Sequence, residues 1–330
     1  MSAGVTVAAR ATAFAAPARA ARHALHDARR TWPETNCYTD LWIELLHARG
    51  CDPTAMLACT VAVDWEGDQW TFFKPATADL RALYGVDVRE LTVWRGLPAH
   101  LAEHTTRGRV VLVEVDAHFL PDTAGTTYRT GHSKTTIGVD AIAPAARALT
   151  YFHNAGHFEL AGDDYDGALG LGPHARADGL PPYAELAVLD RIVHRDPPEL
   201  RAVARERLAR HVACLPDHNP VGAYAAQLDR DVAWLAAGEP DVFHRYAFAT
   251  LRQCGAAWEL AASFLRWLGG EAGDAAPRFD ALAAAAHTLQ LRLARVAYTR
   301  KPADLSAPLA AMAAEWDAGA EVLRRAAGRA

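Results

Sequence analysis

The chain has 330 residues, of which 51% are hydrophobic, and a net charge of −5. This length is sufficient for a sizeable core and for two domains. No apolar run approaches the ~20 residues that a membrane span needs, and no block of basic residues is present, so we expect neither a membrane nor a nucleic acid as partner. Five cysteines without a CxxC pair favour a reducing cytoplasmic location over a disulfide framework.

The first 30 residues are rich in Ala and Arg. They lack the continuous apolar core and the cleavage site of a secretory signal, although their low acidic content leaves a transit-type segment open. We interpret residues 1–30 as a flexible leader.

Residues 31–50, TWPETNCYTDLWIELLHARG, contain a cysteine where a turn passes into a helix-patterned segment. Leu41, Trp42 and Leu45 recur on one helical face, and Gly50 is a stop signal. A thiol in the first turn of a helix lies at the positive end of the helix dipole, which favours the thiolate. Cys37 is therefore either a nucleophile or a buried helix-start residue.

The remainder of the first half mixes short helices with strands. A β-branched run at 109–115, RVVLVEV, predicts a buried strand. Further strands are expected at 69–73, 132–142 and 147–154, and short helices at 77–84 and 98–104. Together with the early helix these elements predict an α+β domain over residues 31–190.

From about residue 195 onward the pattern is helical. Pro-containing starts and Gly or Pro stops delimit helices, which we expect at about 198–214, 220–237, 241–268, 276–300 and 304–327. They predict an α-helical bundle over residues 195–330. The Gly- and Pro-rich segment 162–182 is either a linker or a loop over the first domain.

Three residues occur in the order that cysteine-nucleophile enzymes with a Cys-His-Asn triad require. Cys37 begins a helix, His132 precedes a strand, and Asn154 ends the next strand. In such enzymes the histidine activates the thiol and the asparagine orients the imidazole. Each residue alone has a structural explanation, but their order predicts a catalytic triad.

Other polar and aromatic residues are open to two interpretations. Near His132 in sequence, Asp116, Asp122, Tyr128 and Lys134 either line the site or belong to a solvated loop. The remaining pairs of alternatives are as follows: Trp70 as substrate wall or core, Lys74 as anion contact or surface residue, and Arg252, Gln253 and Glu259 as cleft-facing residues or helix-packing contacts. A metal site made of His153, His157, Asp116 and His118 is a weaker alternative, because HxxxH has helical rather than strand spacing.

Four sequence blocks carry a family resemblance: TWPETNCYTDLWIELLH, DWEGDQWTFFKP, EVDAHFLPDTAGTTYRTGHSKTTIGV and YFHNAGHFEL. With them the chain resembles the bacterial family catalogued as domain of unknown function 1839, over nearly its whole length. That family's layout is similar to the papain-like domain of butirosin biosynthesis protein H and to C39-type cysteine peptidases. The resemblance implies a papain-like (cysteine-peptidase-like) α+β fold.

The same resemblance assigns roles by position. It implies that Cys37 is the nucleophile, His132 the base and Asn154 the orienting residue. The peptidases carry a glutamine before the cysteine as an oxyanion donor, whereas no glutamine precedes Cys37 here. The backbone N–H of Cys37 with Asn36 is then the expected donor set. The further substrate-binding candidates are Asp116, Tyr128, Lys134, Trp70 and His157.

The resemblance to the butirosin enzyme implies transfer of an acyl or aminoacyl group from a carrier-protein thioester to a small amine. The expected partners are therefore an acyl or aminoacyl carrier protein and the amine, with no cofactor and no metal. Two alternatives stay open. One is a cysteine hydrolase that acts on a peptide, amide or thioester, and the other is a non-catalytic binding protein on the same fold.

Overall fold

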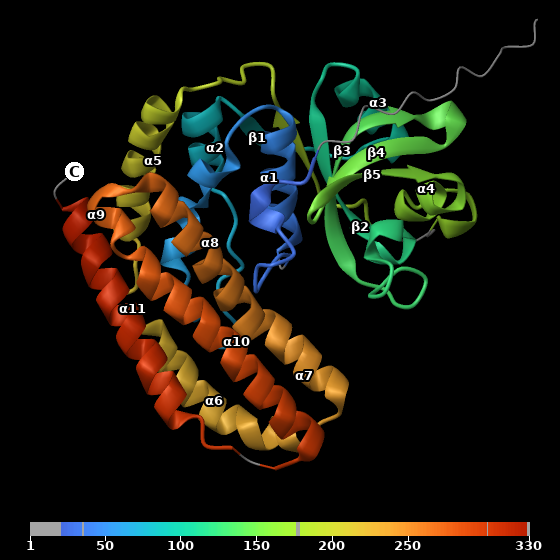
Figure 1. Cartoon of the computed structure of the whole chain (residues 1–330). Coiled ribbons are helices and arrows are strands. Elements are labelled where there is room, and N and C mark those ends of the chain that lie inside the picture. The colour runs from blue at the N-terminus through green and yellow to red at the C-terminus, as the bar shows by residue number, and fades with distance from the viewer. Residues whose placement is uncertain (1–20, 35, 176–178, 302, 329–330) are drawn as a thin grey trace, which may run out of the picture. The chain divides into compact units, whose positions relative to one another are not determined.

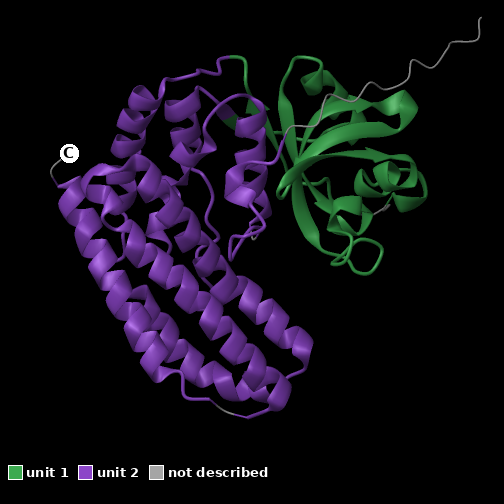
Figure 2. Ribbon diagram, viewed as in Figure 1, with its two compact units in different colours: residues 1–20, 88–190 green, residues 21–87, 191–330 purple. Residues whose placement is uncertain are grey.

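The structure, a computed structural model, describes residues 21–34, 36–175, 179–301 and 303–328 (Figure 1). These residues form two compact units, which Figure 2 colours separately. We call Val88–Asp190 the sheet unit, and Ala21–Asp87 together with Arg191–Ala330 the helical unit. The sheet unit thus lies in sequence between the two stretches that build the helical unit.

The sheet unit contains a six-stranded sheet with the order β1-β6-β2-β3-β4-β5. β2 pairs antiparallel with β6 and β3, β3 with β4, and β4 with β5. The strands are β1 (Asp87–Glu90), β2 (Val110–Asp116), β3 (Lys134–Ala143), β4 (Ala148–His153), β5 (Gly156–Ala161) and β6 (Ala184–Val188). The three strands expected between residues 109 and 154 are confirmed as β2, β3 and β4.

The strand expected at 69–73 does not form. The only β-pairing described there is an isolated bridge between Trp65 and Trp70 across a turn. Aromatic residues there favour a strand in sequence, but the Trp70 ring packs against a helix instead, with its centroid 5.1 Å from that of Trp258. Tertiary packing has overridden the β-propensity of this segment.

Two helices cover the sheet. α3 (Leu97–Thr105) packs against β2 and β3, and α4 (Gly162–Ala168) packs against β2, β4 and β5. The core that these helices form with the sheet contains Val113, Ile137 and Tyr151, all fully buried. α4 lies in segment 162–182, for which the sequence predicts either a linker or a loop over the first domain. Its Gly167 faces the Phe119 ring so closely that a Cβ would lie 2.1 Å from Cδ1.

The first α-helix of the helical unit is α1 (Cys37–Ala48), which is followed by the 3₁₀-helix η2 (Pro53–Ala62) and α2 (Thr77–Tyr84). η2 packs against α1, α5 and α8, while α10 packs against α6, α8 and α11. The later helices are α5 (Pro197–Val212), α6 (Pro220–Ala237), α7 (Pro240–Ala247), α8 (Gln253–Leu268), the short α9 (Gly270–Gly273), α10 (Ala276–Thr299) and α11 (Ser306–Ala327). The helix expected at 241–268 is α7 and α8, joined by a π-helical turn at Phe248–Arg252.

The α+β fold class with a helical region after the sheet is confirmed. The domains expected at 31–190 and 195–330 would group residues 31–87 with the sheet, whereas the compact units group them with the later helices. The reason is apolar burial: η2 is an almost wholly buried segment whose contacts are supplied by α5 and α8. None of the described helices combines the length and apolar composition that a membrane span requires.

Residues 1–20 of the expected flexible leader lie outside the described residues. The rest of it, residues 21–30, includes a short 3₁₀-helix, η1 (Ala24–His26). His26 and Leu25 are buried, and the His26 imidazole binds Glu44 on α1. The sequence did not predict this contact, because a single His–Glu pair produces no periodic pattern.

Candidate functional site

Cys37 is the first residue of α1, as its sequence predicts. The preceding residue, Asn36, is the N-cap: its side-chain oxygen accepts the backbone N–H of Thr39 at 3.1 Å. Cys37 is partly exposed, whereas the rest of the first two turns is buried. Cys37 therefore lies at the positive end of the helix dipole.

The loop before Cys37 is attached to α8. The carboxylate of Glu259 accepts the backbone N–H groups of Thr31 and Trp32, both at 3.0 Å. The Trp32 indole lies against Gly255, where a Cβ would be 2.6 Å from the ring. Of the two roles left open for Glu259, the structure supports a packing contact, and that contact fixes the approach to Cys37.

A second segment holds the first turn of α1 from the other side. The carbonyl oxygen of Phe73 accepts the Asn36 side-chain N–H at 2.7 Å and the Thr39 hydroxyl at 3.1 Å. Lys74 follows, and its Nζ lies 4.4 Å from the centroid of the Tyr38 ring. This cation–π contact brings a positive charge to the residue next to Cys37.

These contacts bear on the expected oxyanion donors. Asn36 is 1% exposed, and its side chain both caps the helix and binds Phe73. Its backbone N–H donates to Asp40 Oδ2 at 3.1 Å. Backbone N–H groups of the first helical turn have no intrahelical acceptors. The N–H of Cys37 itself is therefore the better-suited half of the expected donor set, and the Asn36 assignment stays a prediction.

A buried ionic cluster underlies α1. The Nδ1 of His26 lies 2.5 Å from Glu44 Oε1, and its Nε2 lies 3.4 Å from Asp40 Oδ1. Burial by itself lowers the pKa of His26, but the hydrogen bonds and charges of Asp40 and Glu44 outweigh it and raise the pKa to about 9. The imidazolium therefore persists at neutral pH. One of its two partners, Asp40, follows Cys37 by three residues on α1.

In the sheet unit, His132 pairs with a carboxylate. Its Nδ1 lies 2.6 Å from Asp116 Oδ2, and its ring stacks on His118 with centroids 4.4 Å apart. The antiparallel register of β2 and β3 pairs Asp116 with Lys134, which brings the end of β2 beside His132. Burial raises the pKa of Asp116, but the hydrogen bonds from His132 and from two backbone N–H groups overcome that effect and lower it.

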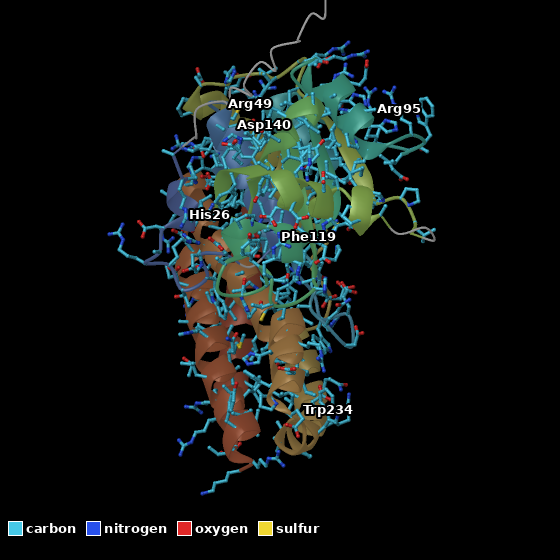
Figure 3. All side chains as sticks on the ribbon, turned by 90° about the vertical axis from the view of Figure 1, so that its right-hand side faces the viewer. His26, Arg49, Arg95, Phe119, Asp140 and Trp234 are labelled. Carbon is cyan, nitrogen blue, oxygen red and sulfur yellow. The ribbon has the colours of Figure 1, made fainter. Side chains whose placement is uncertain are left out.

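This histidine–aspartate pair lines an open cleft of about 880 Å³ within the sheet unit. Lys134 and Glu114 also line the cleft and form an ion pair of 2.9 Å. Phe119, labelled in Figure 3, borders it and lies edge-on to His118. Tyr128, an expected substrate-binding residue, donates its hydroxyl to Asp164 at 2.9 Å.

Asn154 lies in the two-residue turn between β4 and β5 and has a φ of 43°. Asparagine tolerates this left-handed conformation better than most residues. Among the described residues no hydrogen bond joins Asn154 to His132. The carboxylate that orients His132 in this structure is Asp116, and the assignment of Asn154 as orienting residue stays a prediction.

The neighbouring histidines each bind a separate aspartate. His153 lies between Asp122, at 2.5 Å, and the Thr135 hydroxyl, at 2.8 Å. His157 binds Asp140, which Figure 3 labels, at 3.0 Å. Within the part of the chain that the structure describes, no three metal-ligating side chains converge, so the alternative metal site gains no support there.

The remaining sequence candidate, Trp70, is 1% exposed and packs against Trp258 and Tyr224. Trp70 is therefore a core residue, which is one of the two roles that the sequence allows.

The predicted triad takes Cys37 from the helical unit and His132 and Asn154 from the sheet unit, and it stays a prediction. Sequence reasoning missed Asp116 as the partner of His132, because their pairing depends on strand register.

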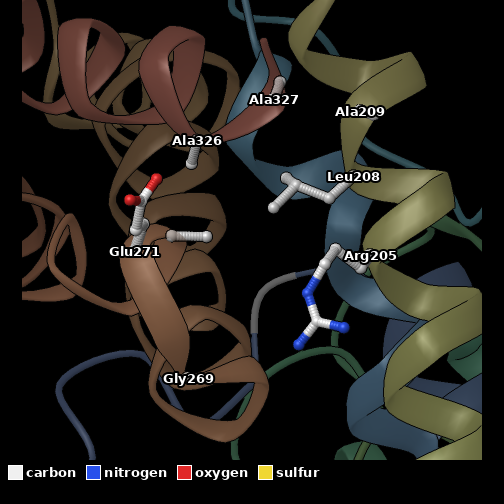
Figure 4. A pocket seen from close by; sticks show the side chains of 8 residues that line it. Arg205, Leu208, Ala209, Gly269, Glu271, Ala326 and Ala327 are labelled. Carbon is white, nitrogen blue, oxygen red and sulfur yellow. The ribbon is translucent and has the colours of Figure 1, made fainter. Parts of the chain in front are cut away.

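A different pocket, of about 290 Å³, opens among the helices (Figure 4). Arg205 on α5 and Glu271 on α9 approach it from opposite sides, and alanines of α11 border it. Its lining contains no cysteine, histidine or serine. The pocket therefore offers a binding surface but no nucleophile of the kind that acyl transfer needs.

Comparison with known families covers both halves of the chain. Residues 21–189 match the DUF1839 N-terminal domain, and residues 198–325 match the DUF1839 C-terminal domain. No curated protein matches the chain. The two matches span nearly the whole sequence in the order of the family, with Cys37, Asp116 and His132 inside the first of them. The chain therefore belongs to the DUF1839 family.

Proposed function

We propose that this protein is a cysteine-dependent acyltransferase. In this proposal Cys37 takes an acyl or aminoacyl group from a carrier-protein thioester and passes it to a small amine. The observation that carries the proposal is the position of Cys37, a partly exposed thiol at the first residue of an Asn-capped helix. Helix-start cysteines of this kind have the electrostatic environment that a nucleophilic thiolate needs.

The hydrogen bonds around this position support the proposal. Glu259 holds the loop before Cys37, and the carbonyl of Phe73 holds the first turn after it. A nucleophile held by packing and hydrogen bonds keeps the geometry that attack on a carbonyl carbon requires. Lys74, over the Tyr38 ring, places a cation beside the residue that follows Cys37.

The proposed reaction has two halves. The Cys37 thiolate attacks the thioester carbonyl, the carrier leaves as its thiolate, and an acyl-Cys37 intermediate remains. The amine then attacks the acyl carbon, His132 is the base that accepts the amine proton, and the C–S bond breaks to release the amide and the Cys37 thiolate. Asp116 supports this role of His132, because a bound carboxylate fixes the tautomer and orientation of an imidazole.

We propose the cytoplasm as the location. All five cysteines are free in the structure, which suits a reducing compartment. The proposal includes an acyl or aminoacyl carrier protein and a small amine as partners, with no cofactor.

The test is intact-protein mass spectrometry after incubation with acyl- and aminoacyl-carrier-protein thioesters. We expect an adduct of the acyl mass that maps to Cys37, is absent from Cys37→Ala and persists in Cys214→Ala, which removes an exposed free thiol. An adduct that survives in Cys37→Ala would overturn the proposal. So would the absence of any adduct, combined with alkylation of Cys37 no faster than that of Cys214.

A second measurement separates transfer from hydrolysis. The acyl-enzyme is isolated and mixed with amines, and the products are identified. An amide product supports the transferase, whereas release of free acid at the same rate with and without amine would identify a hydrolase.

A further inference from the structure

A second cysteine in the helical unit has a histidine partner. The Sγ of Cys51 lies 3.8 Å from Nδ1 of His194, which is hydrogen-bonding distance for sulfur. Cys51 follows α1, beside Gly50, whose φ is 74°. A Cβ at Gly50 would lie 3.8 Å from the His194 ring, so the imidazole rests directly on this turn.

Both partners are held in place by their neighbours. The backbone N–H of Cys51 donates to Leu46 of α1 at 3.0 Å. On the other side, the N–H of Val193 donates to the carbonyl of Tyr84 at 2.8 Å, and the Arg195 guanidinium donates to the carbonyls of Ala82 and Leu83. The residues directly before and after His194 are therefore both hydrogen-bonded, which holds the imidazole beside Cys51.

The pair lines a pocket of about 150 Å³. Its other walls include Asp52, Tyr84, Arg195 and Leu200. Because one water takes up about 30 Å³ of liquid, this space is equivalent to about five waters. This space suits an acyl group of a few heavy atoms. The Tyr84 hydroxyl is engaged with the Asp52 carbonyl at 2.7 Å, which closes that side of the pocket.

We infer that Cys51 and His194 form a second nucleophile–base pair, independent of Cys37, that accepts a small acyl group from a thioester. The inference rests on the coincidence of three features: a thiol, an imidazole within hydrogen-bonding distance of it, and a pocket that both of them line.

The reaction is a thiol–thioester exchange. The Cys51 thiol gives its proton to Nδ1 of His194 as Sγ bonds to the carbonyl carbon. The tetrahedral intermediate then breaks its bond to the original sulfur, and the leaving thiolate takes the proton from the imidazolium. Burial raises the pKa of the Cys51 thiol, so at rest it is protonated and its attack needs this proton acceptor.

The probe for the test is S-acetyl-N-acetylcysteamine, a thioester with a two-carbon acyl group. The full chain is used with Cys37→Ala, so that no acetyl group reaches Cys51 by way of Cys37. Acetylation of each remaining cysteine is followed over time by peptide mass spectrometry. Cys214 is the internal control, because it is exposed and, among the described residues, has no imidazole hydrogen bond to its thiol.

If access alone controlled the rate, the exposed Cys214 would react faster than Cys51, which is 8% exposed. We expect the opposite order, with Cys51 at least about tenfold faster. We also expect His194→Gln to slow Cys51 about 100-fold, within the range typical of general base catalysis, and to leave Cys214 unchanged. Because His194 is exposed, the variant should fold, and an unchanged circular dichroism spectrum checks this.

Acetylation of Cys51 no faster than Cys214, or a rate that is the same in folded His194→Gln, would overturn the inference. Labelling of Cys37 in the parent protein is read separately. The acyl-Cys37 proposal and this inference can therefore fail independently of each other.

Discussion

The carboxylate of Glu259 accepts the backbone N–H of Trp32 at 3.0 Å, although 227 residues separate them in sequence. The other oxygen of the same carboxylate, Oε1, accepts the N–H of Thr31, and Arg30 forms an ion pair with Oε2 at 3.5 Å. One side chain of α8 therefore binds three consecutive residues, Arg30, Thr31 and Trp32, that precede the proposed nucleophile.

Replacement of Glu259 by alanine tests that support. Hydrogen bonds to a charged acceptor contribute about 1.5–3 kcal/mol each, so we expect Glu259→Ala to lower the free energy of unfolding by about 3 kcal/mol. Urea denaturation measures this change. The control is Glu315→Ala, which removes a surface ion pair with Arg278 and should cost less than about 1 kcal/mol. Equal costs for the two variants would contradict the role assigned to Glu259.

The buried His26 predicts a pH dependence of stability. Its pKa is about 9 in the folded protein and 6.5 in its ordinary state, so it binds a proton more tightly when folded. Its stabilisation is fully present below pH 6.5 and is lost as the pH rises through about 9. A shift of this size corresponds to about 3 kcal/mol.

The measurement is the free energy of unfolding of the parent protein and of His26→Gln across this pH range. We expect the difference between them to shrink as the pH rises. The control is His218→Gln, which removes an exposed histidine paired with Asp64 and should track the parent. A constant difference between the parent and His26→Gln would show that His26 carries no charge in the fold.

The partner of His132 can be identified by mutation. If Asp116 orients the imidazole, Asp116→Asn should lower kcat/KM for acyl transfer about 100-fold, because the amide no longer favours the correct tautomer and charge. Asn154→Ala should then have less than a tenfold effect, and Glu114→Gln, which weakens only the ion pair with Lys134, should have little. The reverse order, with Asn154→Ala the more damaging change, would support the assignment by sequence.

Close packing at Gly255 predicts a clash. A methyl group there would lie 2.6 Å from the Trp32 indole, which is itself held in the loop before Cys37. We expect Gly255→Ala to destabilise the fold by about 2 kcal/mol, the cost of overpacking a rigid site. Gly222→Ala, also in a helix, brings its Cβ no closer than 3.9 Å to a neighbour and should be neutral or stabilising by up to about 1 kcal/mol. Thermal unfolding of both variants distinguishes the two cases.

The sequence predicted the positions of individual helices and strands better than it predicted which of them pack together in one unit. α1 begins at Cys37, and α2 and β2 lie within a residue of where periodicity and β-branched content placed them. Those signals are local, since they depend on side chains a few residues apart. Which elements pack together depends on contacts such as those of η2 with α5 and α8, which no local pattern records.

For the candidate functional site, too, the sequence identified individual residues but not the contacts between them. Sequence order identified Cys37 and His132 as candidates, but it did not identify Asp116 as the partner of His132, because β2 and β3 bring them together through their register. The Cys51–His194 pair was missed for a related reason. Its members are 143 residues apart, and neither lies in a recognisable motif.

The division of the helical unit into two stretches has a consequence for synthesis on the ribosome. α1 and η2 emerge early, but α5 and α8, against which η2 packs, are translated only after the entire sheet unit. The sheet unit is continuous in sequence and can fold as it emerges. The surface of η2 that packs against α5 and α8 stays uncovered during that interval. Nascent chains stalled near residue 190 should therefore bind chaperones through residues 37–62 and release them once α8 has been made.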